Sequence, residues 1–208
     1  MVDFEKIKCI IFDFDKTLYS DADLSRVDKE YSKFFVEYNL LDSINNYKEI
    51  LQENLGFHMA QCVFKIAREN KISDKKVREW FDNNIYDITC RGMKTVESQL
   101  LKELCKNFPV YILSDSCNGH LNHYMKMFNY KKSWFKGIIA NKFLDEKMTK
   151  VPHMLEIVKK HNLKADEVLM VGDSIKSDIK AADQAGLQWE HVGNVDDVEQ
   201  IINKLINL

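Results

Sequence analysis

Three runs of consecutive apolar residues mark the chain, and each run stops at a cluster of polar residues. These runs are Cys9–Phe12 before Asp13, Val110–Leu113 before Ser114, and Val168–Val171 before Gly172. Unbroken apolar runs of this length are typical of parallel strands that helices bury on both faces. Weaker apolar runs at 137–140 and 188–192 predict two further strands.

Stretches with apolar residues at helical spacing separate these runs. They cover residues 95–106, 153–161, 175–185 and 195–205. Gly186 follows the third stretch, where a helix commonly ends in the left-handed conformation. The alternation of strands and helices predicts an α/β fold with a Rossmann-like, doubly wound parallel sheet.

Residues 20–90 differ, because their pattern is almost wholly helical. Apolar residues recur at helical spacing in three groups: Leu24, Val27, Tyr31, Phe34, Phe35 and Tyr38; Phe57, Cys62, Phe64 and Ile66; and Val77, Trp80, Phe81 and Ile85. Ser73 is the expected N-cap of the last group. We therefore predict a helical cap at 19–91, inserted into a Rossmann-like catalytic core made of 1–18 and 92–208.

The composition fits this organisation and narrows the function. The chain has 208 residues, of which 45% are apolar and 30% are charged, enough for one α/β domain with a modest accessory module. A formal net charge of −2 argues against binding to nucleic acid or to an anionic membrane, which needs clustered positive charge. The five cysteines lack metal-binding spacing, and we find no signal peptide or membrane-spanning run, so we expect a cytoplasmic protein.

Candidate catalytic residues follow the strands, because open parallel sheets bind ligands beyond the carboxyl ends of their strands. Asp13 and Asp15 leave the first strand. One carboxylate of such a pair can attack phosphorus and form an acyl phosphate, which divides one difficult step into two. The other carboxyl can protonate the leaving group and then activate water.

Further polar residues follow the other two strong strands. Asp173 follows the strand at 168–171, and its carboxylate would complete an oxygen-only site suited to Mg²⁺. Several carboxylates in one place are unfavourable without a cation, so the hypothesis requires the metal. Ser114 can hold a phosphoryl oxygen, and Lys150, ahead of a helix, can neutralise charge on the transferred group.

These residues resemble the four motifs of the haloacid dehalogenase superfamily, in order and at the expected strand ends. The matches are Asp13, Asp15 and Thr17 for DxDxT, Ser114 for the second motif, Lys150 for the third, and Gly172, Asp173 and Asp178 for GDx₄D. The resemblance extends over essentially the whole chain. The helical segment resembles the family's C1 cap, which closes over the substrate.

The resemblance implies catalytic and metal-binding roles for four acids. Asp13 would be the nucleophile and a metal ligand, and Asp15 would be the acid/base and a ligand through its carbonyl oxygen. Asp173 would be a metal ligand, and Asp178 would support the metal site from nearby. We expect these four carboxylates to gather around a single Mg²⁺ ion.

Phosphate-binding roles follow from the same resemblance for Ser114, Lys150, Thr17 and the backbone N–H of Asp115. A turn hydroxyl is an equally good interpretation of Thr17. Relatives often have Asn or Gly in place of Asp115, so its side chain must point away from phosphate or contact another group. Lys147 is a rival for the lysine of the third motif. We favour Lys150 because it lies nearer the start of the helix.

The sequence thus predicts a Mg²⁺-dependent phosphatase that hydrolyses small phosphate monoesters, such as nucleotide monophosphates or sugar phosphates, through an aspartyl-phosphate intermediate. Asp15 argues against the dehalogenase branch of the family, which lacks an acid at that position. A phosphomutase remains open, as does a non-enzymatic phosphorylatable switch or binding module. The i, i+3 pair His120 and His123 favours a surface or packing role rather than a metal site.

Overall fold

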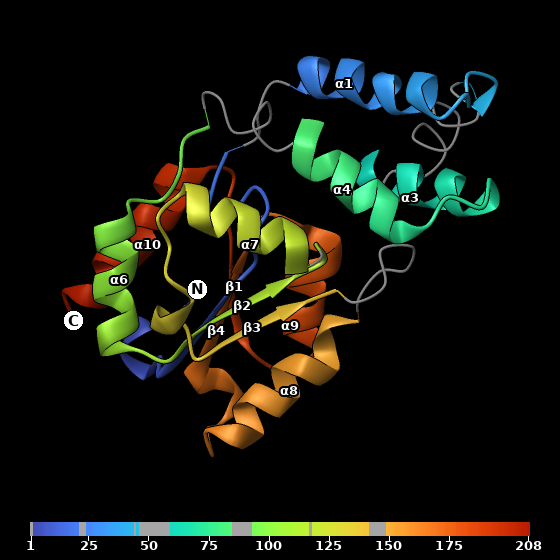
Figure 1. Cartoon of the computed structure of the whole chain (residues 1–208). Helices are drawn as coiled ribbons and strands as arrows, with labels where there is room; N and C mark the ends of the chain where they lie inside the picture. Colours follow the sequence, from blue (N-terminus) through green and yellow to red (C-terminus); the bar gives the residue numbers. More distant parts are fainter. Residues whose placement is uncertain are drawn as a thin grey trace. The chain divides into compact units, whose positions relative to one another are not determined.

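The structure is a computed structural model (Figure 1). It describes residues 2–20, 24–43, 45, 59–84, 93–116, 118–141 and 149–208. The chain divides into two compact units. One consists of Met1–Asp21, Lys94–Lys142 and Lys147–Leu208, and the other mainly of Ala22–Met93.

The first unit is built on a five-stranded sheet in which neighbouring strands are parallel. The strands are β1 (Cys9–Phe12), β2 (Val110–Ser114), β3 (Gly137–Ala140), β4 (Val168–Gly172) and β5 (Gln188–His191). Their order in the sheet is β3-β2-β1-β4-β5. The three inner strands are buried along their whole length, which explains their continuous apolar sequences.

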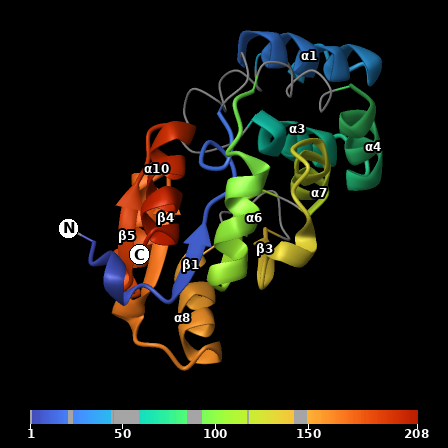
Figure 2. The ribbon, with the colours of Figure 1, turned by 90° about the vertical axis from the view of Figure 1, so that its left-hand side faces the viewer.

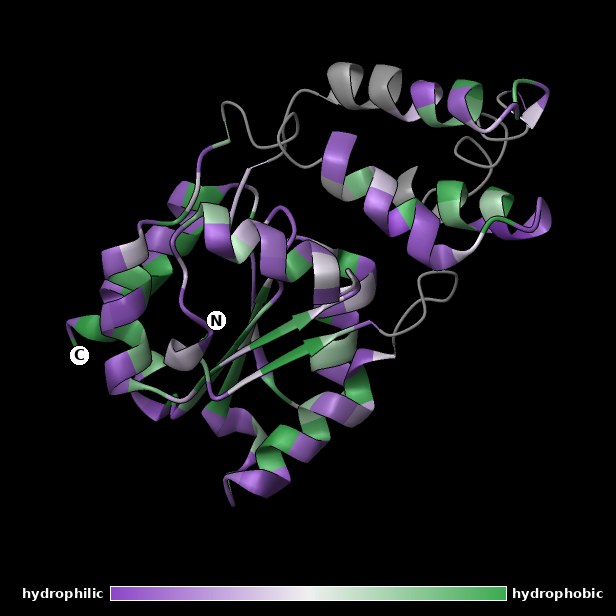
Figure 3. Ribbon diagram, viewed as in Figure 1, coloured by the Kyte–Doolittle hydropathy of each residue, from purple (hydrophilic) through white to green (hydrophobic). Residues whose placement is uncertain are grey.

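Helices cover both faces of this sheet. On one face lie α6 (Ser98–Asn107), α7 (Asn118–Met127) and α10 (Val195–Ile206), and on the other lie α8 (Lys150–Lys160) and α9 (Lys180–Gln184), as Figures 1 and 2 show. Short 3₁₀ turns occupy Phe4–Lys6, Lys132–Trp134 and Ala165–Glu167. Figure 3 shows apolar residues along the strands. Ile11 and Met170 pack in one cluster with Met154 of α8 and Ala182 of α9.

This architecture confirms the predicted α/β, Rossmann-like fold, with two local corrections. The predicted helix at 175–185 starts as a single π-helical turn, Ile175–Ile179, and continues as α9. Lys150 is the first residue of α8 and does not lie ahead of it. None of the helices in the described ranges combines the length and the apolar character that crossing a membrane requires.

The second unit is helical. Its described helices are α1 (Leu24–Glu37), α3 (Met59–Glu69) and α4 (Asp74–Asn84). They share an aromatic core in which the ring of Phe34 meets Trp80 edge to face, with 5.2 Å between ring centroids. Ser73 Oγ accepts a hydrogen bond from the Lys76 N–H at 3.4 Å, as expected of an N-cap. Phe57 and Ile85, which were also predicted to belong to cap helices, lie outside the described residues.

Candidate active site

The candidate site lies at the carboxyl ends of β1 and β4, where the order of the strands reverses direction. From β1 the chain proceeds through β2 to β3 on one side, whereas β4 and β5 lie on the other side. Such a switch point is where open α/β sheets bind ligands. Asp13 follows β1 and Asp173 follows β4, and the Asp13 N–H donates to the Val171 carbonyl at 2.9 Å. Strand pairing therefore continues up to the acids.

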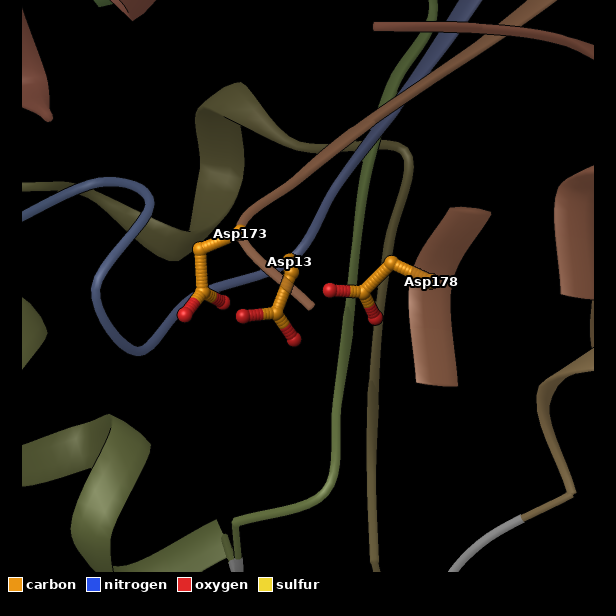
Figure 4. Close-up of side chains that lie close together, drawn as sticks. All are labelled: Asp13, Asp173 and Asp178. Carbon is orange, nitrogen blue, oxygen red and sulfur yellow. The ribbon is translucent and has the colours of Figure 1, made fainter. Parts of the chain in front are cut away.

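Three carboxylates converge at this edge of the sheet. One side-chain oxygen from each of Asp13, Asp173 and Asp178 lies within 4.8 Å of the others. Figure 4 shows Asp13 between the other two, with all three side chains directed to one region. Asp13 and Asp178 are buried, and Asp173 is partly buried. An oxygen-only group of this kind has the donor chemistry that Mg²⁺ selects.

Asp178 owes its position to the π-helical turn and to a glycine. Its Oδ2 accepts a hydrogen bond from the Ser174 N–H at 3.0 Å. A Cβ atom at Gly172 would lie 2.5 Å from the same oxygen, which is closer than a real Cβ contact allows. The glycine that ends β4 is therefore what lets the Asp178 side chain pack against the strand.

Lys150 joins two of these acids. Its Nζ lies 2.8 Å from Asp13 Oδ1 and 2.6 Å from Asp178 Oδ1, and the lysine is 2% exposed. A third carboxylate, from Asp115, lies 3.8 Å from the same nitrogen. Burial disfavours the charged ammonium, but the neighbouring carboxylates outweigh burial and hold the pKa of Lys150 above its ordinary value. The rival Lys147 lies outside the described residues.

The cluster still has an excess of negative charge. Burial first, and then the charges of Asp178 and Asp15, raise the pKa of Asp13, while Lys150 opposes the shift. Burial and Asp178 raise the pKa of Asp173 to about 6. Asp13, Asp173, Asp178 and the Lys150 ammonium carry a net charge of −2 when all are ionised, and the carboxylate of Asp115 adds negative charge nearby. A divalent cation would balance this charge and favour the ionised carboxylates, so the residues fit Mg²⁺.

The side chain of Asp15 does not belong to this group, in contrast to the expectation that four carboxylates gather around one cation. Its Oδ2 accepts a hydrogen bond from Ser114 Oγ at 3.1 Å. Its Oδ1 lies 2.7 Å from His120 Nε2 and accepts a hydrogen bond from the Tyr19 hydroxyl. Asp13 and Asp15 therefore follow the same strand, but their side chains contact different groups.

His120 and Tyr19 are the residues that the sequence did not indicate. His120 was assigned a surface or packing role, and its contact with Asp15 spans 105 positions of the chain. The sequence offered a possible sign only for Tyr19, which lies two residues after the last residue of the DxDxT motif, Thr17. Neither side chain is part of the candidate metal-binding group of Asp13, Asp173 and Asp178.

Two of the remaining predicted residues, Ser114 and Thr17, carry hydroxyl groups that are buried. Ser114 is fully buried, and its Oγ accepts a hydrogen bond from the Ser116 N–H at 3.0 Å. Thr17 is also fully buried, and its Oγ1 has no hydrogen-bond partner among the described residues. Buried hydroxyls are nearly always paired, so the unpaired Thr17 Oγ1 is an exception that the predicted phosphate-binding role would explain.

A family model for haloacid dehalogenase-like hydrolases matches residues 7–186. The chain belongs to this family. The sequence-based assignment to the haloacid dehalogenase superfamily is thus confirmed. A search among curated proteins finds no match for this hydrolase.

Solved structures of other family members share the fold of this hydrolase. A HAD phosphatase from Thermococcus onnurineus is 14% identical with a TM-score of 0.66, over 94% of this chain and 98% of that chain. Magnesium-bound YfnB from Bacillus subtilis is 16% identical with a TM-score of 0.61, over 95% and 99%. A 2-haloacid dehalogenase from Pseudomonas syringae is 15% identical with a TM-score of 0.59, over 95% and 99%. A phosphatase and a dehalogenase have this fold, so the reaction must be argued from the site.

Proposed function

We propose that this hydrolase is a Mg²⁺-dependent phosphatase that acts on small phosphate monoesters through an aspartyl-phosphate intermediate on Asp13. The observation that carries the proposal is the convergence of Asp13, Asp173 and Asp178 around a region that Lys150 neutralises only in part. A phosphorylated metabolite is the substrate class that such a charged site suits. We further propose that the second unit, mainly Ala22–Met93, serves as the cap that the sequence predicts at 19–91.

Asp13 is the proposed nucleophile. One of its carboxylate oxygens attacks phosphorus, and the bond from phosphorus to the ester oxygen breaks with its electron pair going to the leaving oxygen. Asp15 supplies the proton that this oxygen takes up, because its carboxyl lies beside Ser114, a proposed phosphate ligand. The products of this step are an alcohol and an aspartyl phosphate.

Water completes the reaction. Asp15, now ionised, removes a proton from water, and the water oxygen attacks the phosphorus of the aspartyl phosphate. The bond to Asp13 breaks, its electrons return to the carboxylate, and inorganic phosphate leaves. Asp15 is protonated again, so that the second carboxyl serves as acid in one step and as base in the next.

The other residues hold charge in place during these steps. Asp13, Asp173 and Asp178, together with the Asp15 carbonyl oxygen, are the groups that we propose at the cation site. When bound there, Mg²⁺ supplies charge compensation for the phosphoryl oxygens and for the acids. Lys150 is buried beside Asp13 and supplies a fixed positive charge at the phosphoryl group. Ser114, Thr17 and the backbone N–H of Asp115 are the proposed phosphate ligands.

A reducing compartment suits this chemistry and the cysteines. Cys9, Cys62 and Cys105 are not in disulfide bonds in the described part of the chain, and the first two are buried. We propose the cytoplasm as the location, where small phosphorylated metabolites serve as substrates.

Turnover of p-nitrophenyl phosphate tests the proposal. The enzyme should release many equivalents of phosphate per chain with Mg²⁺ and lose activity in EDTA. Asp13→Asn should abolish turnover, because a neutral amide is a poor nucleophile. Asp183→Asn is the matched control, since Asp183 is an exposed acid of α9, and it should leave the rate unchanged.

Two results would overturn the proposal. Full activity in EDTA would show that the reaction does not need a divalent cation. Retained turnover in Asp13→Asn would show that Asp13 is not the nucleophile. A single equivalent of phosphate per chain would instead identify a phosphorylatable switch. If phosphatase activity is confirmed, a panel of phosphorylated metabolites then identifies the substrate.

A further inference from the structure

The carboxylate of Asp15 is held by hydrogen-bonding groups on both of its oxygens. Ser114 Oγ donates to Oδ2 at 3.1 Å. The Tyr19 hydroxyl donates to Oδ1, and His120 Nε2 lies 2.7 Å from that same oxygen. The side chain of Asp15 is 15% exposed and that of His120 24% exposed, so these contacts form at the partly covered edge of the site.

Aromatic packing fixes both groups that contact Oδ1. The ring of Tyr19 stacks on that of Tyr124 in α7, with centroids 5.1 Å apart and 14° between the planes. The imidazole of His120 lies against the same Tyr124 ring, with centroids 4.4 Å apart. Phe14 meets the Tyr19 ring edge to face at 5.5 Å. One ring of α7 thus orients both the hydroxyl and the imidazole toward Asp15.

The backbone around Tyr19 is fixed as well. Tyr19 forms an antiparallel bridge with Thr95, and the Val96 N–H donates to the Leu18 carbonyl at 3.0 Å. The buried hydroxyl of Tyr130 bonds the carbonyls of Leu18 at 3.3 Å and Val96 at 2.7 Å. A hydroxyl whose ring and backbone are both restrained loses little entropy when it holds a partner.

We infer that Tyr19 and His120 are positioning residues for the acid/base Asp15, an inference that rests on the proposed function. They hold Oδ1, so that Oδ2 stays directed to the proposed phosphate ligand Ser114. Each contributes to the proton-transfer steps through Asp15 and does not itself touch the reacting atoms.

The assignment to single oxygens of Asp15 follows from the groups that contact each of them. The Tyr19 hydroxyl and His120 Nε2 both contact Oδ1, whereas Oδ2 lies beside the proposed phosphate ligand Ser114, so we assign the proton transfer to Oδ2. In the first step the Oδ2–H bond breaks, its electrons stay on Oδ2, and the leaving oxygen gains the proton. In the second step Oδ2 takes a proton from water, which restores the neutral acid.

The dependence of the rate on the leaving group tests this inference. Nitrophenolate departs with little need of a proton, whereas an alkoxide requires one. Removal of the Tyr19 hydroxyl in Tyr19→Phe keeps the ring and should lower kcat/KM for an alkyl phosphate about 3–10-fold, the value of one hydrogen bond. The loss for p-nitrophenyl phosphate should be clearly smaller. His120→Leu should behave likewise, and His120→Gln, which restores an N–H donor, should recover part of the activity.

The fold supplies a matched control. Tyr111 in β2 pairs with His161 Nε2 at 2.8 Å, so the unit contains a second tyrosine–histidine pair that does not contact Asp15. Tyr111→Phe should reduce both substrates equally or not at all. The ratio of the two kcat/KM values within one variant does not depend on the amount of folded enzyme, so partial unfolding does not mimic the expected result.

Asp15→Asn separates failure of this inference from failure of the proposed function. If Asp15→Asn loses activity equally on both substrates, Asp15 is not the acid and the proposed function is wrong at this residue. If Asp15→Asn discriminates strongly between the substrates but Tyr19→Phe and His120→Leu match Tyr111→Phe, only the positioning roles are overturned. Discrimination in all three variants supports the inference.

Discussion

Replacement of Lys150 by methionine should strongly destabilise the hydrolase when no divalent cation is present. Methionine keeps an unbranched apolar stem but removes the charge and the hydrogen bonds that the ammonium donates to Asp13 and Asp178. The side chain of Lys150 is 1% exposed, and so is its partner Asp178, while Asp13 is 8% exposed. The substitution therefore leaves two buried carboxylates without their only close lysine among the described residues.

The loss of folding free energy depends on how deeply the ion pair is buried rather than on the distance between its charged atoms. Removal of one partner of a buried ion pair costs about 3–5 kcal/mol, because the other charge stays buried and uncompensated. Lys8 forms a comparably short contact with Glu167, at 2.5 Å, but its side chain is 60% exposed. Exposed pairs contribute about 0–1 kcal/mol. Lys8→Met is the matched control, with the same chemical change and an expected loss of about 1 kcal/mol or less.

Urea unfolding in EDTA at pH 7.5 measures both effects. With a denaturant dependence of about 2 kcal/mol per molar, the midpoint of Lys150→Met should fall by roughly 1.5–2.5 M. The loss should be smaller at pH 5.5. Without the lysine the pKa of Asp13 rises further in the folded state, so the folded protein takes up protons that the unfolded chain lacks, and acid stabilises the variant. Equal losses in Lys150→Met and Lys8→Met would refute the argument.

Two further predictions concern the proposed ligands. Thr17→Val should keep or raise the melting temperature, because it removes a buried hydroxyl without a partner among the described residues. It should also lower kcat/KM for a phosphate monoester about 10-fold or more. Unchanged kinetics would instead identify Thr17 as a turn residue. In the ion-free enzyme the pKa of Asp173 is about 6 instead of 3.8, so the melting temperature should fall as pH rises from about 4 to 6. Mg²⁺ should raise the melting temperature at pH 7.5 more than at pH 5, and Asp173→Asn should remove most of this increase; a pH-independent Mg²⁺ effect would argue against Asp173 as a ligand.

The strands could be predicted because burial on both faces leaves an unbroken apolar run, as in Cys9–Phe12 and Val168–Val171. The edge strand β5 gave a weaker signal, since Trp189 and His191 are exposed there. The π-helical turn at Ile175–Ile179 could not be predicted, because its apolar spacing does not differ from that of an ordinary helix. Its extra residue is recognisable only from the bond between the Ile179 N–H and the Ser174 carbonyl.

The acids of the site could be predicted for a different reason. Asp13 and Asp173 directly follow adjacent parallel strands, so the strand register brings them together. No such rule links Asp15 to His120. His120 lies on α7, and its contact with Asp15 depends on the conformation of its side chain, which packs against Tyr124. The i, i+3 spacing of His120 and His123 favoured a surface or packing role and carries no sign of a contact with Asp15.

The different roles that we propose for Asp13 and Asp15 fit the order of the strands. Because β2 and β4 lie on opposite sides of β1, one strand end reaches both neighbours. The β4 side provides acids, which fit a cation, and the β2 side provides the hydroxyl of Ser114. A cation close to a carboxyl holds it in the ionised form, which suits a nucleophile but opposes a proton donor. The separation of the Asp15 carboxyl from the acid cluster therefore allows a single strand end to supply both the proposed nucleophile and the proposed acid.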